Sequence, residues 1–116
     1  QEIGSSYGAQ VEMHHYEPLF KDMRQDKQLL NLFKDVMTEF GESPRILPDD
    51  EADGSTDVGN VSYEVPTAQP TLQIGLGLEA HTPEFTCAAG SDYGLDQAIK
   101  GAKIMAVVAL RYAMCK

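Results

Sequence analysis

Apolar and polar side chains alternate over three short stretches of the chain. The first is residues 9–16, where apolar residues from Ala9 to Met13 alternate with polar ones. The other two are residues 61–65 and residues 71–76. A period of two is typical of a β-strand with one face in a core and the other in water. The pattern therefore predicts three short strands.

A period of three to four residues predicts an α-helix from Asp26 to Phe40. Asp26 is its expected N-cap, because the carboxylate can accept hydrogen bonds from the free amides of the first turn. Gly41 follows at the position where a left-handed residue closes a helix. The apolar residues form one stripe, as expected for a helix with one buried side: Leu29, Phe33, Val36, Met37 and Phe40.

A second helix is predicted from Asp92 to the C-terminus. From Ile104 onwards this helix is apolar almost all round, so it must be covered on most sides. Its Gly101 allows another element to approach the backbone closely. The order strand, helix, strand, strand, helix predicts an α/β fold. One side of the second helix carries a stripe of apolar and small residues: Leu95, Ile99, Ala102, Ala106, Ala109, Leu110 and Ala113.

Composition and charge narrow the class of protein. A chain of 116 residues, 42% hydrophobic and 23% charged, has the size and composition of one globular domain. Its formal net charge of −9 argues against nucleic acid and against an anionic membrane surface, since both attract clustered Lys and Arg. The start at Gln1 without a methionine indicates a piece of a longer protein.

The cysteines and the apolar runs indicate the cell compartment. Cys87 and Cys115 form neither a metal-binding spacing nor a disulfide framework, so both are expected to be free thiols in a reducing compartment. The longest apolar run, from Ile104 to Met114, is too short to cross a bilayer. We therefore expect a soluble, cytoplasmic protein.

The acidic loop from Asp49 to Asp57 is the first place where metal-binding groups gather. Its alternating acidic residues partly fit a calcium loop, but Asn60 stands where the closing glutamate belongs and helices do not flank it. For the first half of the loop we prefer a solvated surface loop. Ser55, Thr56 and Asp57 are a compact set of short acceptors, able to cap a neighbouring helix or brace a site.

His81 is the second candidate group. Pro83 favours an extended backbone at Thr82, so His81 is expected in a loop and not inside a helix. It follows a predicted strand, where open α/β sheets often hold functional residues. Glu84 can orient this loop or cap the helix that begins nearby. The alternative is that His81 only hydrogen-bonds locally.

Four segments carry a resemblance to a known family. With the Ala-rich terminal helix, they resemble the C-terminal part of the dinuclear metal amidohydrolases and metallopeptidases. This family includes aminoacylases, carboxypeptidase G and p-aminobenzoyl-glutamate hydrolase, and its β-alanyl-dipeptidase-like branch (peptidase domain-containing protein 2) is the most similar. The segments are Gly54-Ser55-Thr56-Asp57-Val58-Gly59-Asn60-Val61-Ser62, Val65-Pro66, His81-Thr82-Pro83-Glu84-Phe85 and Ala88-Ala89-Gly90-Ser91.

The resemblance implies a parent enzyme of two domains. Residues 1–18 would end a ferredoxin-like lid domain that often mediates dimers, and residues 19–116 would belong to a zinc-exopeptidase-like catalytic α/β domain. The parent would hold two divalent ions, zinc or else manganese or cobalt. It would hydrolyse an amide or peptide bond of a small N-acyl amino acid or dipeptide through metal-activated water. The N-terminal half of the same catalytic domain would be this chain's partner.

The resemblance also implies residue roles. His81 would be a metal ligand, while Ser55, Thr56, Asp57 and Glu84 would lie beside the site or face the substrate. The other ligands and the catalytic glutamate have no counterpart in these residues. A catalytic zinc needs about three protein ligands, so this chain alone is expected to be inactive.

Glu17 departs from the family pattern. Several relatives have an arginine before the proline at this point, and that arginine clamps a substrate carboxylate. An acid here favours a cationic group instead, such as the basic end of a dipeptide. Outside the resemblance, two other functions stay open: a non-catalytic α/β interaction module that pairs through its exposed N-terminal strand, and a calcium-loop protein.

Overall fold

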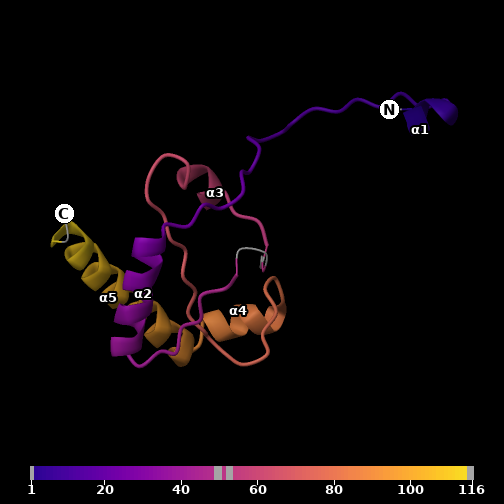
Figure 1. Cartoon of the computed structure of the whole chain (residues 1–116). Helices are drawn as coiled ribbons and strands as arrows, with labels where there is room; N and C mark the ends of the chain where they lie inside the picture. The colour runs from indigo at the N-terminus through magenta and orange to yellow at the C-terminus, as the bar shows by residue number, and fades with distance from the viewer. Residues whose placement is uncertain (1, 49–50, 52–53, 115–116) are drawn as a thin grey trace.

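In the computed structural model, which describes residues 2–48, 51 and 54–114, the chain is helical. Figure 1 shows two longer helices crossing each other, with shorter helices around them and a thin N-terminal segment leading away. The described helices are α1 (Glu2–Ser6), α2 (Lys27–Glu39), α3 (Val58–Val61), α4 (Pro83–Ala89) and α5 (Asp92–Met114).

The predicted α/β fold is wrong for this structure, because the described residues contain no β-strand. Residues 9–16 and 71–76 are not helical. A β-strand also needs a neighbouring strand that completes its hydrogen-bond ladder, and these residues have none in the part of the chain that the structure describes. Residues 61–65 instead form the end of α3 and a turn, where the N–H of Val65 donates to the oxygen of Val61 at 3.1 Å. The expected catalytic sheet and lid strand are therefore absent from the described chain.

Helix α2 confirms the sequence prediction at both ends and along its stripe. The carboxylate of Asp26 accepts from the N–H of Leu29 at 2.8 Å, which caps the first turn. Gly41 has φ of 82°, the left-handed conformation that ends a helix at little cost for glycine. Val36 and Met37 are buried, and the other stripe residues are partly buried around them.

Helix α5 confirms its expected start, but it is not covered on most sides as expected. The expected stripe is open to solvent, with Leu95 54%, Ile99 55% and Leu110 67% exposed. The reason is that a helix apolar nearly all round has two usable faces, and the packing of α2 selects one of them. The buried residues of α5 are Gly94, Gln97, Ile104 and Val108.

The core lies where α2 crosses α5. Ile104 and Val108 are each 2% exposed and pack with Val36 and Met37 of α2. Apolar burial of this kind is the main favourable contribution to such a contact. The crossing of the two helices therefore holds the helical body together.

Two ion pairs flank the crossing of α2 and α5. Arg111 holds both carboxylate oxygens of Glu39, at 2.6 and 2.8 Å, and Lys100 reaches Glu42 at 2.6 Å. The Arg111 hydrogen bonds hold the pKa of Glu39 below its usual value. Because solvent screens partly exposed ion pairs, they add little to the stability that burial supplies.

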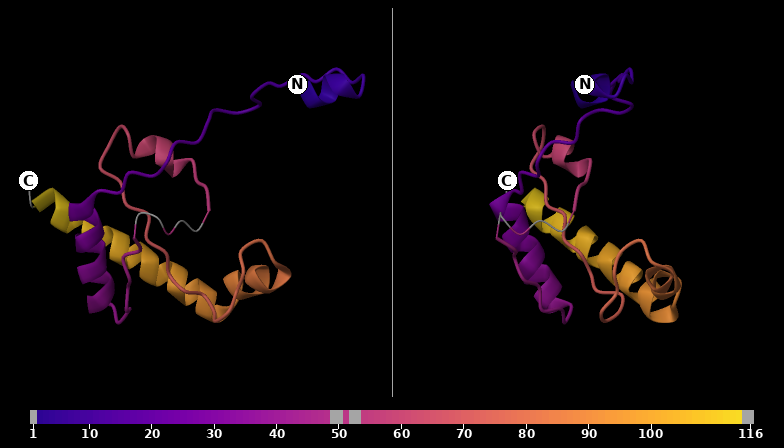
Figure 2. Two further views of the ribbon diagram at one scale, coloured as in Figure 1. Left: turned by 45° about the vertical axis from the view of Figure 1, so that its right-hand side comes forward. Right: turned by 90° about the vertical axis from the view of Figure 1, so that its right-hand side faces the viewer.

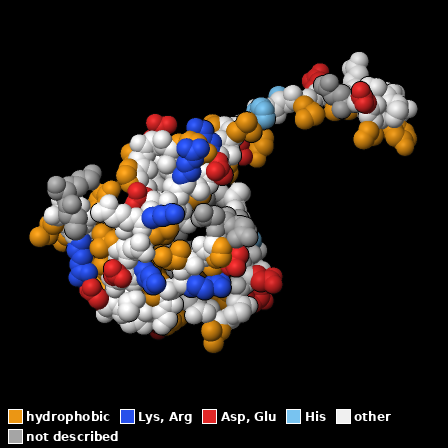
Figure 3. Space-filling view, viewed as in Figure 1, with side chains coloured by type: hydrophobic (Ala, Val, Ile, Leu, Met, Phe, Trp, Pro, Cys, Tyr) orange, Lys and Arg blue, Asp and Glu red, His pale blue; other side chains and the backbone are white. Residues whose placement is uncertain are grey.

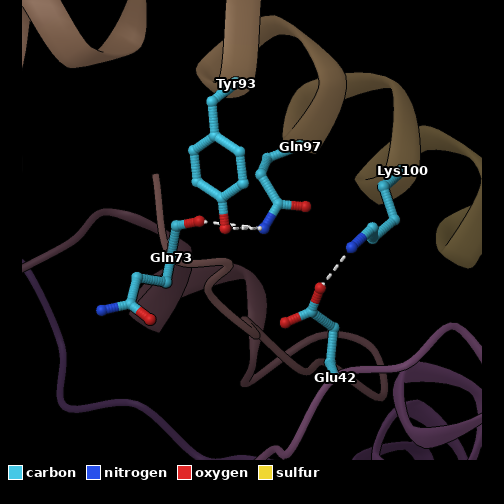
Figure 4. Close-up of polar contacts among 5 residues, drawn as sticks. All are labelled: Glu42, Gln73, Tyr93, Gln97 and Lys100. Carbon is cyan, nitrogen blue, oxygen red and sulfur yellow. Dashed lines mark hydrogen bonds and ion pairs between the residues drawn. The ribbon is translucent and has the colours of Figure 1, made fainter. Parts of the chain in front are cut away.

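Residues 71–74 run along α5 as an extended segment. The side chain of Gln97, only 3% exposed, donates to the backbone oxygen of Gln73 at 3.0 Å and to the hydroxyl of Tyr93 at 2.9 Å, as Figure 4 shows together with the Lys100–Glu42 pair. Gly101 of α5 leaves room for Leu72, because a Cβ there would lie 3.1 Å from the Leu72 side chain. The glycine thus permits the close approach that the sequence predicted at this helix.

The N-terminal segment leads away from the helical body. Every residue from 11 to 20 is exposed, and α1 contacts none of the other described helices. Figure 2 shows α1 at the far end of this segment in both views, which fits the extents of 62 × 38 × 23 Å. None of the described helices has the length and apolar character needed to span a membrane.

Candidate functional site

Ser55, Thr56 and Asp57 form the turn that leads into α3. The hydroxyl of Thr56 accepts from the N–H of Val58 at 3.3 Å, so Thr56 satisfies the first free amide of the helix. Asp57 stands at the N-cap position, but its side chain makes no capping bond there. Ser55 and Asp57 are exposed, which leaves the hydroxyl and the carboxylate accessible to a ligand.

His81 lies in the loop before α4, as predicted, and its backbone is in the left-handed region with φ of 66°. Such a conformation is uncommon for a residue with a side chain. The loop ends at Thr82, which caps α4. The Thr82 hydroxyl accepts from the N–H of Phe85 at 3.2 Å and donates to the backbone oxygen of Glu79 at 2.8 Å. His81 is an exposed residue, so its imidazole is accessible to a ligand.

Glu84 does not cap α4, because the hydroxyl of Thr82 makes that bond. Glu84 is instead the acidic residue of the first turn, where its charge interacts favourably with the helix dipole. Its other suggested role, orienting the His81 loop, stays a prediction.

The structure places the candidate residues in three separate regions. Ser55, Thr56 and Asp57 lead into α3, His81 and Glu84 lie at the start of α4, and Glu17 lies in the exposed N-terminal segment. Among the described helices, α4 packs against α5, whereas α3 contacts no other helix. No three His, Cys, Asp or Glu side chains in the described residues are close enough together to hold a metal ion. The arrangement offers single ligands and proton acceptors, but no assembled metal centre.

Two expectations from the sequence fall at least partly on residues that the structure does not describe. Asp49, Asp50 and Asp53, which the calcium-loop hypothesis needs, lie outside the described residues. Cys115 lies outside them too, while Cys87 is a free, exposed thiol as expected.

A cluster around Tyr63 was not foreseen from the sequence. The Tyr63 hydroxyl donates to the carboxylate of Asp22, and Arg24 and Lys21 lie over the ring at 3.8 and 4.5 Å from its centre. This hydrogen bond holds the pKa of Asp22 below its ordinary value and raises the pKa of Tyr63. The partners are 41 residues apart in the chain, and no local spacing signals their contact.

An apolar cavity of about 490 Å³ was also missed. It lies between α2, α5 and residues 68–74, beside the buried Gln97. The sequence predicts a short strand at residues 71–76 and gives no signal of a hollow beside it. Figure 3 shows one face of the molecule, with apolar, basic and acidic side chains intermixed over the helical body.

Part of the chain is similar to two curated proteins. Over 57 residues it is 44% identical to a protein named Xaa-Arg dipeptidase from Homo sapiens. This segment of the chain is therefore similar in sequence to part of that dipeptidase. The protein of the same name from Mus musculus matches over the same length with the same identity.

The similarity covers unequal shares of the two kinds of chain. The matched segment is 49% of this chain but only 13% of each dipeptidase, so it corresponds to a small part of those relatives. No protein-family profile matches the chain. No solved structure matches it either.

Proposed function

We propose that this chain is a segment of a metal-dependent dipeptidase or related amidohydrolase, and that the whole protein hydrolyses an amide or peptide bond of a small substrate. The observation that carries the proposal is the 44% identity to two dipeptidases over 57 residues. A match at that identity supports common descent of the segment. The substrate class, the metal and the partner are part of the proposal.

The described residues do not form a complete metal site, because no three suitable ligands come together among them. His81 fits the role of one ligand: it is exposed, it lies in a loop, and neutral imidazole is a common ligand for divalent metals. The exposed oxygens of Ser55 and Asp57 fit a supporting role beside substrate or metal. The remaining ligands and the catalytic acid–base group would come from outside this chain.

Glu17 supports a substrate with a basic end. Its carboxylate is exposed and would attract a cationic group of a dipeptide. The name of the two relatives, Xaa-Arg dipeptidase, agrees with such an end. The proposed substrate is therefore a dipeptide, or a similar small amide, that carries a cationic side chain.

The open face of α5 supports docking onto a larger catalytic unit. Leu95, Ile99 and Leu110 expose more than half of their surface on one helix. Full burial of one such side chain contributes about 1.5–3 kcal/mol, so covering the three favours association. The proposed partner is the N-terminal half of the same catalytic domain, since the relatives extend far beyond the matched segment.

The proposal is tested with His81→Ala in the longest protein that the gene encodes around this segment. We expect the variant to lose bound metal and to lose dipeptidase activity by at least about a hundredfold. His14→Ala is the matched control, because it removes an exposed imidazole from the N-terminal segment. Full metal content and full activity in His81→Ala would refute the role of His81, and absence of hydrolase activity in the wild-type protein would refute the function itself.

The alternative, a non-catalytic interaction module, rests on the exposed N-terminal segment, which carries Ile3, Tyr7 and Met13 at 79–86% exposure. Exposed apolar side chains of this kind can pack against a partner protein. A stable monomer without metal uptake and without activity in any longer form would favour this function.

A further inference from the structure

Residues 19–24, here called the strap, lie against residues 59–63. These residues are the end of α3 and the turn after it, and they are here called the latch loop. The side chain of Asn60 joins the two segments with both of its polar atoms. Its oxygen accepts from the N–H of Lys21 at 2.7 Å, and its nitrogen donates to the backbone oxygen of Leu19 at 3.1 Å. Asn60 therefore pairs with the strap's backbone in the way that a peptide group would.

Two neighbours of Asn60 add backbone contacts. A Cβ on Gly59 would overlap the backbone oxygen of Lys21, so the two backbones touch where no side chain fits. The hydroxyl of Ser62 accepts from the N–H of Arg24 at 2.9 Å and donates to the oxygen of Gly59 at 2.6 Å. Ser62 thus braces the latch loop and holds the far end of the strap.

Tyr63 closes the contact from the side. Its hydroxyl is bonded to Asp22, and the cations of Lys21 and Arg24 lie over its ring. Such cations are attracted by the negative face of the ring. The latch loop therefore holds the strap both through its backbone and through its side chains.

We propose that the latch loop is a clamp that sets the direction in which the N-terminal segment, residues 2–18, leaves the region between the end of α3 and the start of α2. The strap is the first part of the chain after this segment that the latch loop holds, and residues 11–18 before it are all exposed. Pro18 stands at the junction, where its ring restricts the backbone. Opening the clamp frees the segment to swing.

The clamp also gives a physical route between distant parts of the chain. Asp57 is two residues before Gly59, and Thr56 bonds the intervening Val58. The turn that carries Ser55 and Asp57 therefore directly precedes the residues that hold the strap. The clamp thus connects the N-terminal segment with one of the candidate regions.

Amide hydrogen exchange of the full chain tests the clamp through Asn60→Ala. We expect about fivefold to tenfold faster exchange at Arg24, whose own acceptor, Ser62, is untouched. Asn60→Asp keeps the acceptor for Lys21 and should show a smaller increase. Asn31→Ala is the control, since Asn31 is exposed on α2. Unchanged exchange at Arg24 in Asn60→Ala would show that the contacts open one by one and would overturn the clamp.

A second measurement reads the direction of the segment itself. Spin labels at Cys87 and at an introduced Glu12→Cys, in a Cys115→Ser background, report the distance between segment and body. We expect a broader distance distribution in Asn60→Ala and in Gly59→Ala, and no change in Asn31→Ala. If Asn60→Ala and Gly59→Ala gave the same distance distribution as Asn31→Ala and the wild-type chain, the proposal would be overturned. So would an equal acceleration of exchange at Val36 and Val108, because the effect would then be global unfolding.

Discussion

At the scale of single residues, the Asp22–Tyr63 hydrogen bond is the clearest electrostatic feature. It lowers the pKa of Asp22 and raises that of Tyr63, with Arg24 nearby also favouring the ionised Asp22. A carboxyl with a lowered folded-state pKa contributes stability above its unfolded pKa of about 4, and this contribution is lost as the pH falls through the folded value. A raised tyrosine pKa has the opposite sign. Its contribution is present at neutral pH and is lost as the pH rises above about 10.

This predicts that Tyr63→Phe raises the pKa of Asp22 towards its ordinary value. The carboxyl carbon shift of Asp22, followed by NMR from neutral pH into acid, measures it. Arg24 and Lys21 remain in the variant, so the change isolates the hydroxyl. An unchanged Asp22 titration would assign the shift to Arg24 instead.

Glu17 carries a second prediction, which rests on the proposed function. In the whole protein, Glu17→Gln should reduce the preference for dipeptides with a basic end over neutral ones by about tenfold, the effect of one lost charged contact. The ratio of kcat/KM values measures the preference, with Glu12→Gln in the same segment as control. Equal ratios in wild type and Glu17→Gln would exclude the role.

At the scale of elements, the two faces of α5 allow a matched test. Ile104 is 2% exposed and Ile99 is 55% exposed on the same helix. Ile104→Ala should lower the free energy of unfolding by about 2–4 kcal/mol, because it leaves a cavity in the core. Ile99→Ala should change it by less than about 1 kcal/mol. Urea unfolding followed by circular dichroism measures both, and equal losses would mean that the face of Ile99 is buried as well.

The helices also show which local predictions were reliable. The ends of α2 could be predicted because Asp26 and Gly41 act through bonds and dihedral angles within a few residues. The start of α5 and the loop position of His81 were local as well. The prediction of strands at residues 9–16 and 71–76 was wrong because alternation describes only the two faces of a strand. A strand also needs a neighbouring strand to hydrogen-bond with, and these residues have none within the described ranges.

At the scale of the whole molecule, the exposed stripe on α5 predicts self-association of the isolated chain. Leu95 and Leu110 are open to water, and contiguous apolar surface favours contact between copies. Leu95→Gln with Leu110→Gln should shift the chain towards monomer in sedimentation experiments, while Lys103→Gln, exposed on the same helix, should not. A wild-type chain that stays monomeric at high concentration would contradict self-association through this stripe.

In the candidate site, too, features set by neighbouring residues could be predicted, whereas contacts between distant segments could not. The sequence pointed to Ser55, Thr56, Asp57 and His81 as candidate polar groups. The structure confirms the loop position of His81, whereas the turn at Thr56 leads into α3 and not into the predicted strand. The sequence did not reveal that α3 and α4 make no contact. Their roles as ligands stay predictions, because the groups that would complete a site are not among the described residues.

The features that depend on neighbours along the chain could be predicted from the residues alone: the helix that Asp26 begins and Gly41 ends, the start of α5 and the loop of His81. The buried face of α5, the direction of the Asn60 amide and the contact of Tyr63 with Asp22 across 41 residues depend on how distant parts of the chain pack together. The physical reason is that capping and helix periodicity are satisfied within a few residues, whereas burial and long-range pairing are chosen among several faces of similar apolar character.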